Sequence, residues 1–214
     1  PLQKRTIDQA AICVSKIRQT LGFNIPLMLD LACPNDPNVS LKLAPLVKEF
    51  KPYWFEEPVD GEATRTLIKI KNQTGLRIVT GEKQCGINHF IEILSADAVD
   101  IFNPDISSVG GIIDMIKIIE LSNKNNVRVS PHCWNSMSIA ASAMVHLCMS
   151  FPNTEMAEFF PEYIPYTLKF CNKNFEINNG FIELDNREGL GVKIDTNLLM
   201  ENTSSYKFSI LNKN

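Results

Sequence analysis

Short apolar runs alternate along the chain with longer segments in which apolar residues recur at the spacing of a helix. The short runs predict strands at 25–30, 53–57, 77–82, 98–105, 127–132 and 154–159. The segments between them predict helices near 8–20, 38–50, 62–74, 86–95, 109–124 and 136–149. Because parallel strands must be joined by a crossover element, this alternation predicts an α/β fold built on a parallel sheet.

Each predicted strand ends in one side chain that can carry chemistry. Successive members of this set are separated by 26, 26, 23, 27 and 26 residues, and the set is Asp30, Glu56, Glu82, Asp105, His132 and Glu158. A single acidic residue at a strand end is most often solvated or caps a helix, but a nearly constant period favours a shared site. In a (β/α) barrel the carboxyl ends of all strands gather on one face, where active sites form. We therefore predict a TIM-type (β/α) barrel with a site on that face.

The first three members of the set predict a metal site. Asp30, Glu56 and Glu82 would converge from three neighbouring strands, and converging carboxylates remain ionised only around a cation. Ligation by oxygen with room for water suits Mg²⁺. A zinc site is the alternative, because three cysteines also follow strand ends, but no pair of them has local ligand spacing: Cys33, Cys85 and Cys133.

Composition narrows the class of partner. The 214 residues carry a formal net charge of −3, which offers no basic field for nucleic acid and no polybasic surface for lipid. No apolar run approaches the ~20 residues of a membrane span. The six cysteines are scattered without a C-x-x-C pair, a pattern typical of free thiols in a reducing compartment. We expect a cytoplasmic protein whose partner is a small molecule, with neither nucleic acid nor membrane as a partner.

Several motifs resemble a known family. "LMLD", "WFEEP", "VTGE", "NPDISSVGGI" and "SPHCW", in this order, resemble the barrel domain of the mandelate racemase/muconate lactonizing group in the enolase superfamily. The resemblance covers roughly residues 8–195. "PHCW" followed by "IAASA", "EFFPEY" and "GLGV" is most similar to the acid-sugar dehydratases. The resemblance implies the TIM-type barrel of this superfamily.

The resemblance also implies a Mg²⁺ site made by Asp30, Glu56 and Glu82. The family uses the first glutamate of "EEP", and strand alternation agrees that only one of Glu56 and Glu57 can face the barrel centre. One position departs from the family: the first ligand strand usually reads Asp-x-Asn, whereas this chain has Ala32. That change puts an accessory polar contact in doubt, but not the metal.

The reaction implied is removal of the proton α to a carboxylate, which gives an enediolate that Mg²⁺ stabilises. His132 and Asp105 would form a dyad, and Glu158 would contact the substrate carboxylate. Dehydration of a sugar acid to a 2-keto-3-deoxy acid is the leading reaction, with His132 as either the base or the acid. A racemase or epimerase of a 2-hydroxy acid is the alternative in the same class, and it would need a second base on the opposite face of the substrate. A truncated, non-catalytic metal-binding paralogue is the alternative in a different class.

Four further residues are candidates for binding the substrate. Trp134 and Asn135 directly follow "PHC" and are predicted to line the pocket. Asn103 precedes Asp105 by two residues and is either a pocket residue or a group that caps its strand. Lys83 follows the third carboxylate and reaches either substrate or solvent.

The predicted domain organisation rests on a change in the sequence pattern near residue 175, where strand-like alternation replaces the alternation of strands and helices. Residues 1–174 are predicted to form the barrel portion with the metal and catalytic residues. Residues 175–214, which contain the turn "NNG", are predicted to form a hairpin and irregular chain that returns toward a capping domain. Six strands cannot close a barrel with eight-strand geometry. We therefore expect the N-terminal capping domain and first barrel strands of the family to be absent from this chain, and we expect a homo-oligomer.

Overall fold

The computed structural model describes residues 4–34, 36–60, 63–134, 138–172 and 175–202. In this part of the chain, five parallel strands pair in sequence order, β1-β2-β3-β4-β5. Their bounds are β1 (Met28–Asp30), β2 (Trp54–Glu56), β3 (Ile78–Thr80), β4 (Ile101–Phe102) and β5 (Arg128–Val129). The predicted α/β fold with a parallel sheet is confirmed.

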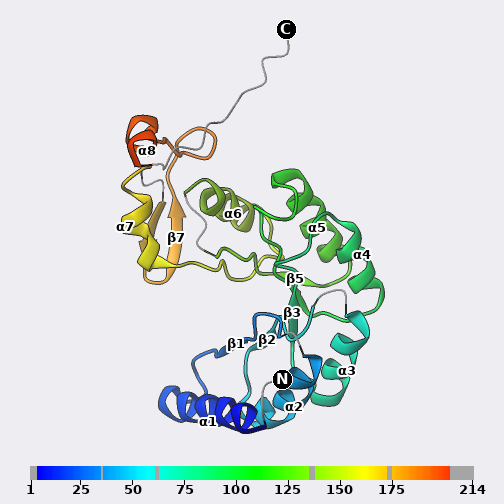
Figure 1. Cartoon of the computed structure of the whole chain (residues 1–214). Coiled ribbons are helices and arrows are strands. Elements are labelled where there is room, and N and C mark those ends of the chain that lie inside the picture. The colour runs from blue at the N-terminus through cyan, green and yellow to red at the C-terminus, as the bar shows by residue number, and fades with distance from the viewer. Residues whose placement is uncertain (1–3, 35, 61–62, 135–137, 173–174, 203–214) are drawn as a thin grey trace.

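Helices connect these strands and follow one another in an arc around them (Figure 1). The helices bury apolar residues; in α3, for example, Leu67 and Ile70 are buried while Arg65 and Lys69 are exposed. A 3₁₀ turn, η1 (Lys48–Phe50), extends the second helix. The helix bounds are α1 (Lys4–Leu21), α2 (Pro37–Val47), α3 (Thr64–Thr74), α4 (Asn88–Ser95), α5 (Ile112–Lys124) and α6 (Ser138–Ser150).

The two faces of the sheet have different neighbours. Phe55, Ile78 and Phe102 belong to the main hydrophobic core, which lies between the sheet and the helices. Trp54 and Val79 belong to a smaller cluster on the opposite face. Because side chains alternate along a strand, a residue two positions after Trp54 points to this inner face. The alternation therefore points Glu56, at the end of β2, away from the helices and toward the inner face of the sheet.

The predicted strand over 154–159 is only partly formed. Thr154 makes an isolated parallel bridge with Val129, and the amide of Glu155 donates to the Val129 carbonyl at 2.8 Å. Farther along, the amide of Glu158 lies 3.4 Å from the Pro131 carbonyl. The segment thus runs beside β5 without a continuous ladder, and this placement brings Glu158 to the same end of the sheet as the other strand-end residues.

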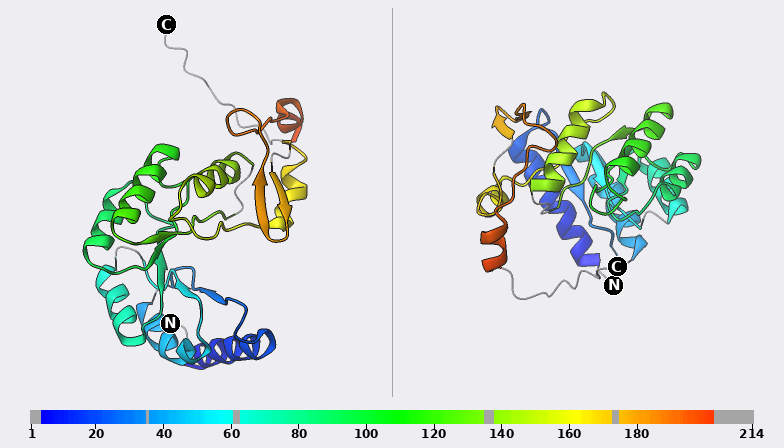
Figure 2. Two further views of the ribbon diagram at one scale, coloured as in Figure 1. Left: turned by 180° about the vertical axis from the view of Figure 1, so that it is seen from behind. Right: turned by 90° about the horizontal axis from the view of Figure 1, so that it is seen from above.

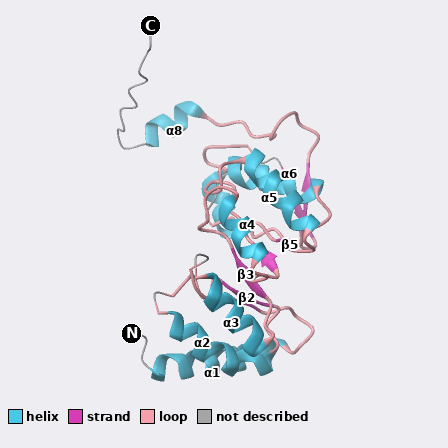
Figure 3. Cartoon of the chain, turned by 90° about the vertical axis from the view of Figure 1, so that its right-hand side faces the viewer, coloured by secondary structure: helices cyan, strands magenta, loops and turns pink. Residues whose placement is uncertain are grey.

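The chain after this segment forms a small unit of its own beside α6, as seen from behind and from above in Figure 2. The predicted hairpin is present, with Asn179 and Gly180 at positive φ angles of 52° and 82°, as a tight two-residue turn requires. Apolar residues of β7 pack on the buried face of α6, and the last helix lies apart from the sheet (Figure 3). The elements are η2 (Pro161–Tyr163), α7 (Ile164–Thr167), β6 (Phe175–Asn178), β7 (Phe181–Leu184) and α8 (Thr196–Asn202).

The predicted boundary at residue 174 stays a prediction. Part of the segment expected to be irregular is helical, since α8 occupies Thr196–Asn202. Among the described residues, no helix combines the length and the apolar character needed to cross a lipid bilayer.

Candidate active site

A histidine–aspartate pair forms the centre of the candidate site. His132 Nδ1 lies 2.7 Å from Asp105 Oδ2, and the two residues also form a backbone bridge. Asp105 is 5% exposed, and its other oxygen accepts the amide of Ser107 at 2.7 Å. Burial alone would raise the pKa of Asp105, but the hydrogen bonds from His132 and Ser107 outweigh it and lower the pKa. The carboxylate is therefore held ionised and orients the imidazole ring.

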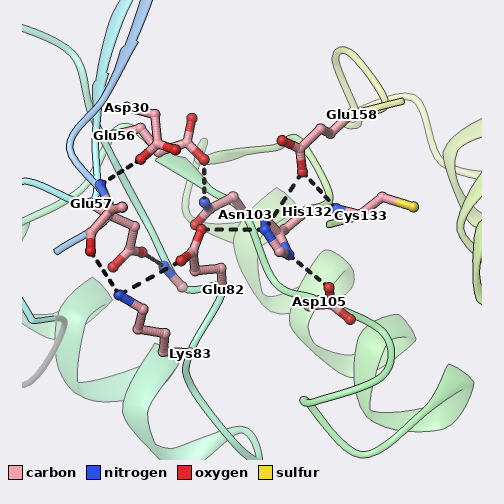
Figure 4. A network of polar contacts seen from close by, with 12 residues as sticks. Asp30, Glu56, Glu57, Glu82, Lys83, Asn103, Asp105, His132, Cys133 and Glu158 are labelled. Atoms are coloured by element: carbon pink, nitrogen blue, oxygen red, sulfur yellow. Dashed lines mark hydrogen bonds and ion pairs between the residues drawn. The ribbon is translucent and has the colours of Figure 1, made fainter. Parts of the chain in front are cut away.

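The other ring nitrogen of His132 faces two more carboxylates (Figure 4). Nε2 lies 3.5 Å from Glu82 Oε2 and 3.7 Å from Glu158 Oε2. The same oxygen of Glu158 also accepts the amide of Cys133, at 2.7 Å. Burial would lower the pKa of His132, but the bond to Asp105 and the charges of Glu158 and Glu82 outweigh it and raise the pKa.

Glu56 carries the most perturbed carboxyl group of the site. Its two oxygens accept hydrogen bonds from Trp54 Nε1 at 2.9 Å and from Asn103 Nδ2 at 2.8 Å. Burial, followed by the negative charge of Asp30, raises the pKa of Glu56 to about 7. Asp30 is its direct partner across the β1–β2 register and lies exposed at the rim, where its Oδ1 accepts the amide of Ala32 at 2.7 Å.

The third carboxylate of the predicted metal site, Glu82, follows β3 in a turn. Burial raises its pKa, the charge of His132 lowers it and the charge of Asp30 raises it again, so that the pKa is raised overall. Carboxylates that raise one another's pKa form a region of excess negative charge. Such a region favours a cation.

Glu57 takes a different direction from Glu56. Its φ angle of 40° lies in the left-handed region, and its side chain is buried against the end of β3, where Oε1 accepts bonds from the Thr80 hydroxyl and the Gly81 amide, both at 2.8 Å. Burial is the largest cause that raises the pKa of Glu57. The structure thus turns only Glu56 toward the inner face, as strand alternation predicted.

A pocket of about 310 Å³ opens on this inner face, and its walls include Asp30, Glu56, Asn103, His132 and Glu158. The volume is at the lower end of what small-molecule sites occupy. Five of its walls are polar or charged groups that come from separate strand ends, which suits a small polar ligand.

The donor set fits Mg²⁺ in its chemistry, because three carboxylates from neighbouring strand ends supply only oxygen. Within the described part of the chain, however, no three side chains of His, Cys, Asp or Glu lie close enough together to hold a metal ion as they stand. Metal binding would therefore require side-chain rotation within this set, for which the exposed position of Asp30 leaves room.

The four candidates for substrate binding have different surroundings. Asn103 is 2% exposed, lines the pocket and donates to Glu56, while its Oδ1 has no hydrogen-bond partner among the described residues. Trp134 is 60% exposed and packs against Phe160 instead of lining this pocket. Lys83 Nζ lies 3.2 Å from the Ala32 carbonyl, at the solvent-facing rim. Asn135 lies outside the described residues.

Two contributors were missed by the sequence reasoning. The Trp54 indole binds an oxygen of Glu56, and the main-chain amide of Cys133 binds Glu158. The position of Trp54, two residues before Glu56 on one strand, is a signal that could have identified it, because such residues share a face. The Cys133 amide could not be predicted, because every residue except proline carries a main-chain donor.

Comparison with known proteins places these features in a wider group. The family model described as "Enolase C-terminal domain-like" matches residues 2–198. D-galactonate dehydratase of Ralstonia pickettii is 31% identical over 209 residues, which cover 92% of this chain and 53% of that protein. A solved structure described as an enolase from the environmental genome shotgun sequencing of the Sargasso Sea is 46% identical, with a TM-score of 0.88 over 93% of this chain and 53% of that one.

A second solved structure, the 3,6-anhydro-D-galactonate cycloisomerase of Zobellia galactanivorans, is 29% identical, with a TM-score of 0.80 over 91% of this chain and 55% of that one. The chain therefore spans about half the length of the relatives that it matches.

Proposed function

The chain belongs to the enolase C-terminal domain-like family, and on that basis we propose that it removes the proton α to the carboxylate of a sugar acid and eliminates water to give a 2-keto-3-deoxy acid. The observation that carries the proposal is the His132–Asp105 pair, whose outer nitrogen faces the pocket between two carboxylates. The relatives named D-galactonate dehydratase and 3,6-anhydro-D-galactonate cycloisomerase support a sugar acid as the substrate.

His132 is the group that moves protons in this proposal. Asp105 accepts a hydrogen bond from Nδ1, which fixes the tautomer and leaves Nε2 to exchange a proton with the ligand. Two roles are open to Nε2: it takes the α-proton and then delivers it to the departing β-hydroxyl, or it only protonates that hydroxyl while a second base takes the α-proton. The enol product then ketonises without further help from the protein.

The carboxylates at the strand ends bind and orient. Asp30, Glu56 and Glu82 would hold Mg²⁺, which when bound acts as a Lewis acid that stabilises negative charge on the substrate carboxylate by several kcal/mol. Glu158 lies across the pocket from these three and would approach the substrate carboxylate. Trp54 and Asn103 restrain Glu56 so that it presents its oxygens to the inner face.

Turnover of a panel of aldonic and aldaric acids tests the proposal. We expect 2-keto acid formation from at least one acid, its loss in EDTA and its recovery with Mg²⁺. His132→Asn should abolish the product, whereas His89→Asn, which changes a histidine in α4, should retain it. Turnover that is unaffected by chelation, or full activity in His132→Asn, would refute the mechanism.

Exchange of the α-proton in D₂O separates the two roles of His132. If Nε2 is the base, His132→Asn loses both the exchange and the product. If it is the acid, the variant still exchanges the α-proton but forms no 2-keto acid.

A further inference from the structure

We propose that Glu57 is a positioning residue that fixes the carboxylates of the candidate metal site relative to one another. Its side chain holds the main chain just before Glu82, and its own main chain holds the turn just after Asp30. This inference rests on the proposed function, because it concerns the same carboxylates. It assigns to Glu57, the second glutamate of "EEP", a role that its position in the sequence does not suggest.

The side chain of Glu57 contacts the carboxyl end of β3 and the residue that follows it. Oε1 accepts the Thr80 hydroxyl and the Gly81 amide, and Gly81 directly precedes Glu82. The chain at Gly81 is confined on its other side: its φ is 137°, and a Cβ there would lie 2.9 Å from Phe90 Cε1. The Gly81 amide is thus fixed between a carboxylate and a packed aromatic ring, so that the direction in which Glu82 leaves the strand is set.

The main chain of Glu57 is hydrogen-bonded to the segments that carry the other carboxylates of the site. Its carbonyl accepts the Cys33 amide at 2.9 Å, and the carbonyl of Glu56 accepts the Leu31 amide at 3.1 Å, so both amides that flank Ala32 are held. Its own amide donates to the Val79 carbonyl at 2.9 Å. The left-handed conformation of Glu57 lets these bonds form while Glu56 faces the pocket. The segments that carry Asp30, Glu56 and Glu82 therefore meet at one residue.

The cost of this arrangement argues against a role in packing alone. Glu57 is 1% exposed, makes no ion pair among the described residues, and its Oε2 has no hydrogen-bond partner there. Burial of a carboxyl group with an unsatisfied oxygen is unfavourable compared with an apolar side chain of similar size. A role in folding alone would therefore be served as well by methionine, whereas positioning requires the acceptor.

Three variants test the inference. Glu57→Met removes the acceptor at similar size, and Glu57→Gln keeps an acceptor oxygen for Thr80 and Gly81. Glu155→Met is the matched control, because Glu155 is a mostly buried carboxylate in ion pairs with Arg77 and Arg128, outside the candidate metal site. Each variant is compared with the unmodified chain in Mg²⁺ affinity by calorimetry, in hydrogen exchange of the Gly81 amide and in urea unfolding.

We expect Glu57→Met to weaken Mg²⁺ binding ~10–100-fold, the range found when groups that orient metal ligands are removed, and to accelerate exchange of the Gly81 amide. Glu57→Gln should restore Mg²⁺ affinity to within ~3-fold. Glu155→Met should lower stability and leave Mg²⁺ affinity unchanged. A purely structural role would move only the unfolding curve.

The outcomes separate this inference from the proposed function. Mg²⁺ binding by the unmodified chain together with equal affinity in Glu57→Met would overturn the inference alone. So would a loss in Glu57→Gln as large as in Glu57→Met. Absence of Mg²⁺ binding by the unmodified chain would overturn both proposals. If Glu57→Met does not fold, Thr80→Val removes one of the two side-chain partners of Glu57, and unchanged Mg²⁺ affinity in that variant would overturn the inference.

Discussion

At the scale of single residues, Glu56 shows how burial and neighbouring charge act together. The group ordinarily titrates near 4.5, but in the fold its pKa is raised to about 7 by burial and by Asp30. A raised pKa means that the protonated form is favoured in the fold. The corresponding stability is fully present below pH 4.5 and is lost as the pH rises through about 7.

We therefore expect the metal-free protein to lose about 1–3 kcal/mol of unfolding free energy between pH 4.5 and 8 through this group. Urea unfolding in EDTA across this range measures the loss. Glu56→Gln, which cannot ionise, should flatten the pH dependence, and saturating Mg²⁺ should reverse its sign because binding favours the ionised carboxylate. Equal slopes for the unmodified protein and Glu56→Gln would contradict the assignment.

Among the neighbours of His132 that raise its pKa, Asp105 has the largest effect. The bond to Asp105 opposes the burial that would lower this pKa, so Asp105→Asn should lower the pKa of His132. Titration of the three histidine ring signals by NMR measures this, with His132→Asn to assign the resonance. Turnover should fall by at least ~100-fold. An unchanged pKa of His132 in Asp105→Asn would show that other groups set it.

At the scale of elements, the period of strand-end residues predicted which side chains meet, but not where the strands end. Asp105 and His132 lie beyond β4 and β5 and are joined by a single bridge, because only two or three residues of each strand form the ladder. Apolar runs extend past these ladders, since residues at the strand ends are also buried. Hydrophobicity therefore located each strand and overestimated its length.

The bends at the strand ends could not be predicted. Ala32, Cys33 and Glu57 adopt positive φ angles without being glycine, and hydrogen bonds between segments far apart in the chain hold them. The direction of Glu57 depends on Thr80 and Gly81, more than twenty residues away. Local patterns carry no information on such bonds, so the sequence indicated only that Glu56 and Glu57 differ.

Arg18 links two helix ends. It is 3% exposed, and its guanidinium donates to the carbonyls of Gly22, Ile25, Phe50 and Lys51 at 2.7 to 3.1 Å. Gly22 and Ile25 lie in the chain that follows α1, and Phe50 and Lys51 lie at the end of η1, so Arg18 joins these two segments.

We expect Arg18→Met to lower the unfolding free energy by ~3 kcal/mol, because several buried carbonyls lose their donor. Lys16→Met, on the exposed face of the same helix, should change it by less than ~0.5 kcal/mol. Chemical denaturation compares the two. Coincident curves for Arg18→Met and the unmodified protein would contradict this role.

At the scale of the whole molecule, polar groups gather at both ends of the sheet with different character. The carboxyl ends of the strands carry acids whose charges raise one another's pKa. Toward the amino ends, Glu155 binds Arg77, Arg128 and the hydroxyl of Tyr53. The second network pairs one carboxylate with two guanidinium groups, whereas the first gathers several carboxylates, which favours a cation.

This contrast leads to the central claim, that Asp30, Glu56 and Glu82 bind one divalent ion. Mn²⁺ prefers the same oxygen ligands as Mg²⁺ and scatters anomalously, so a crystal structure of the protein with Mn²⁺ tests the claim most directly. We predict one anomalous peak on the inner face of the sheet, with an oxygen from each of the three carboxylates in its coordination shell. A peak elsewhere, or one that any of the three carboxylates does not reach, would contradict the claim.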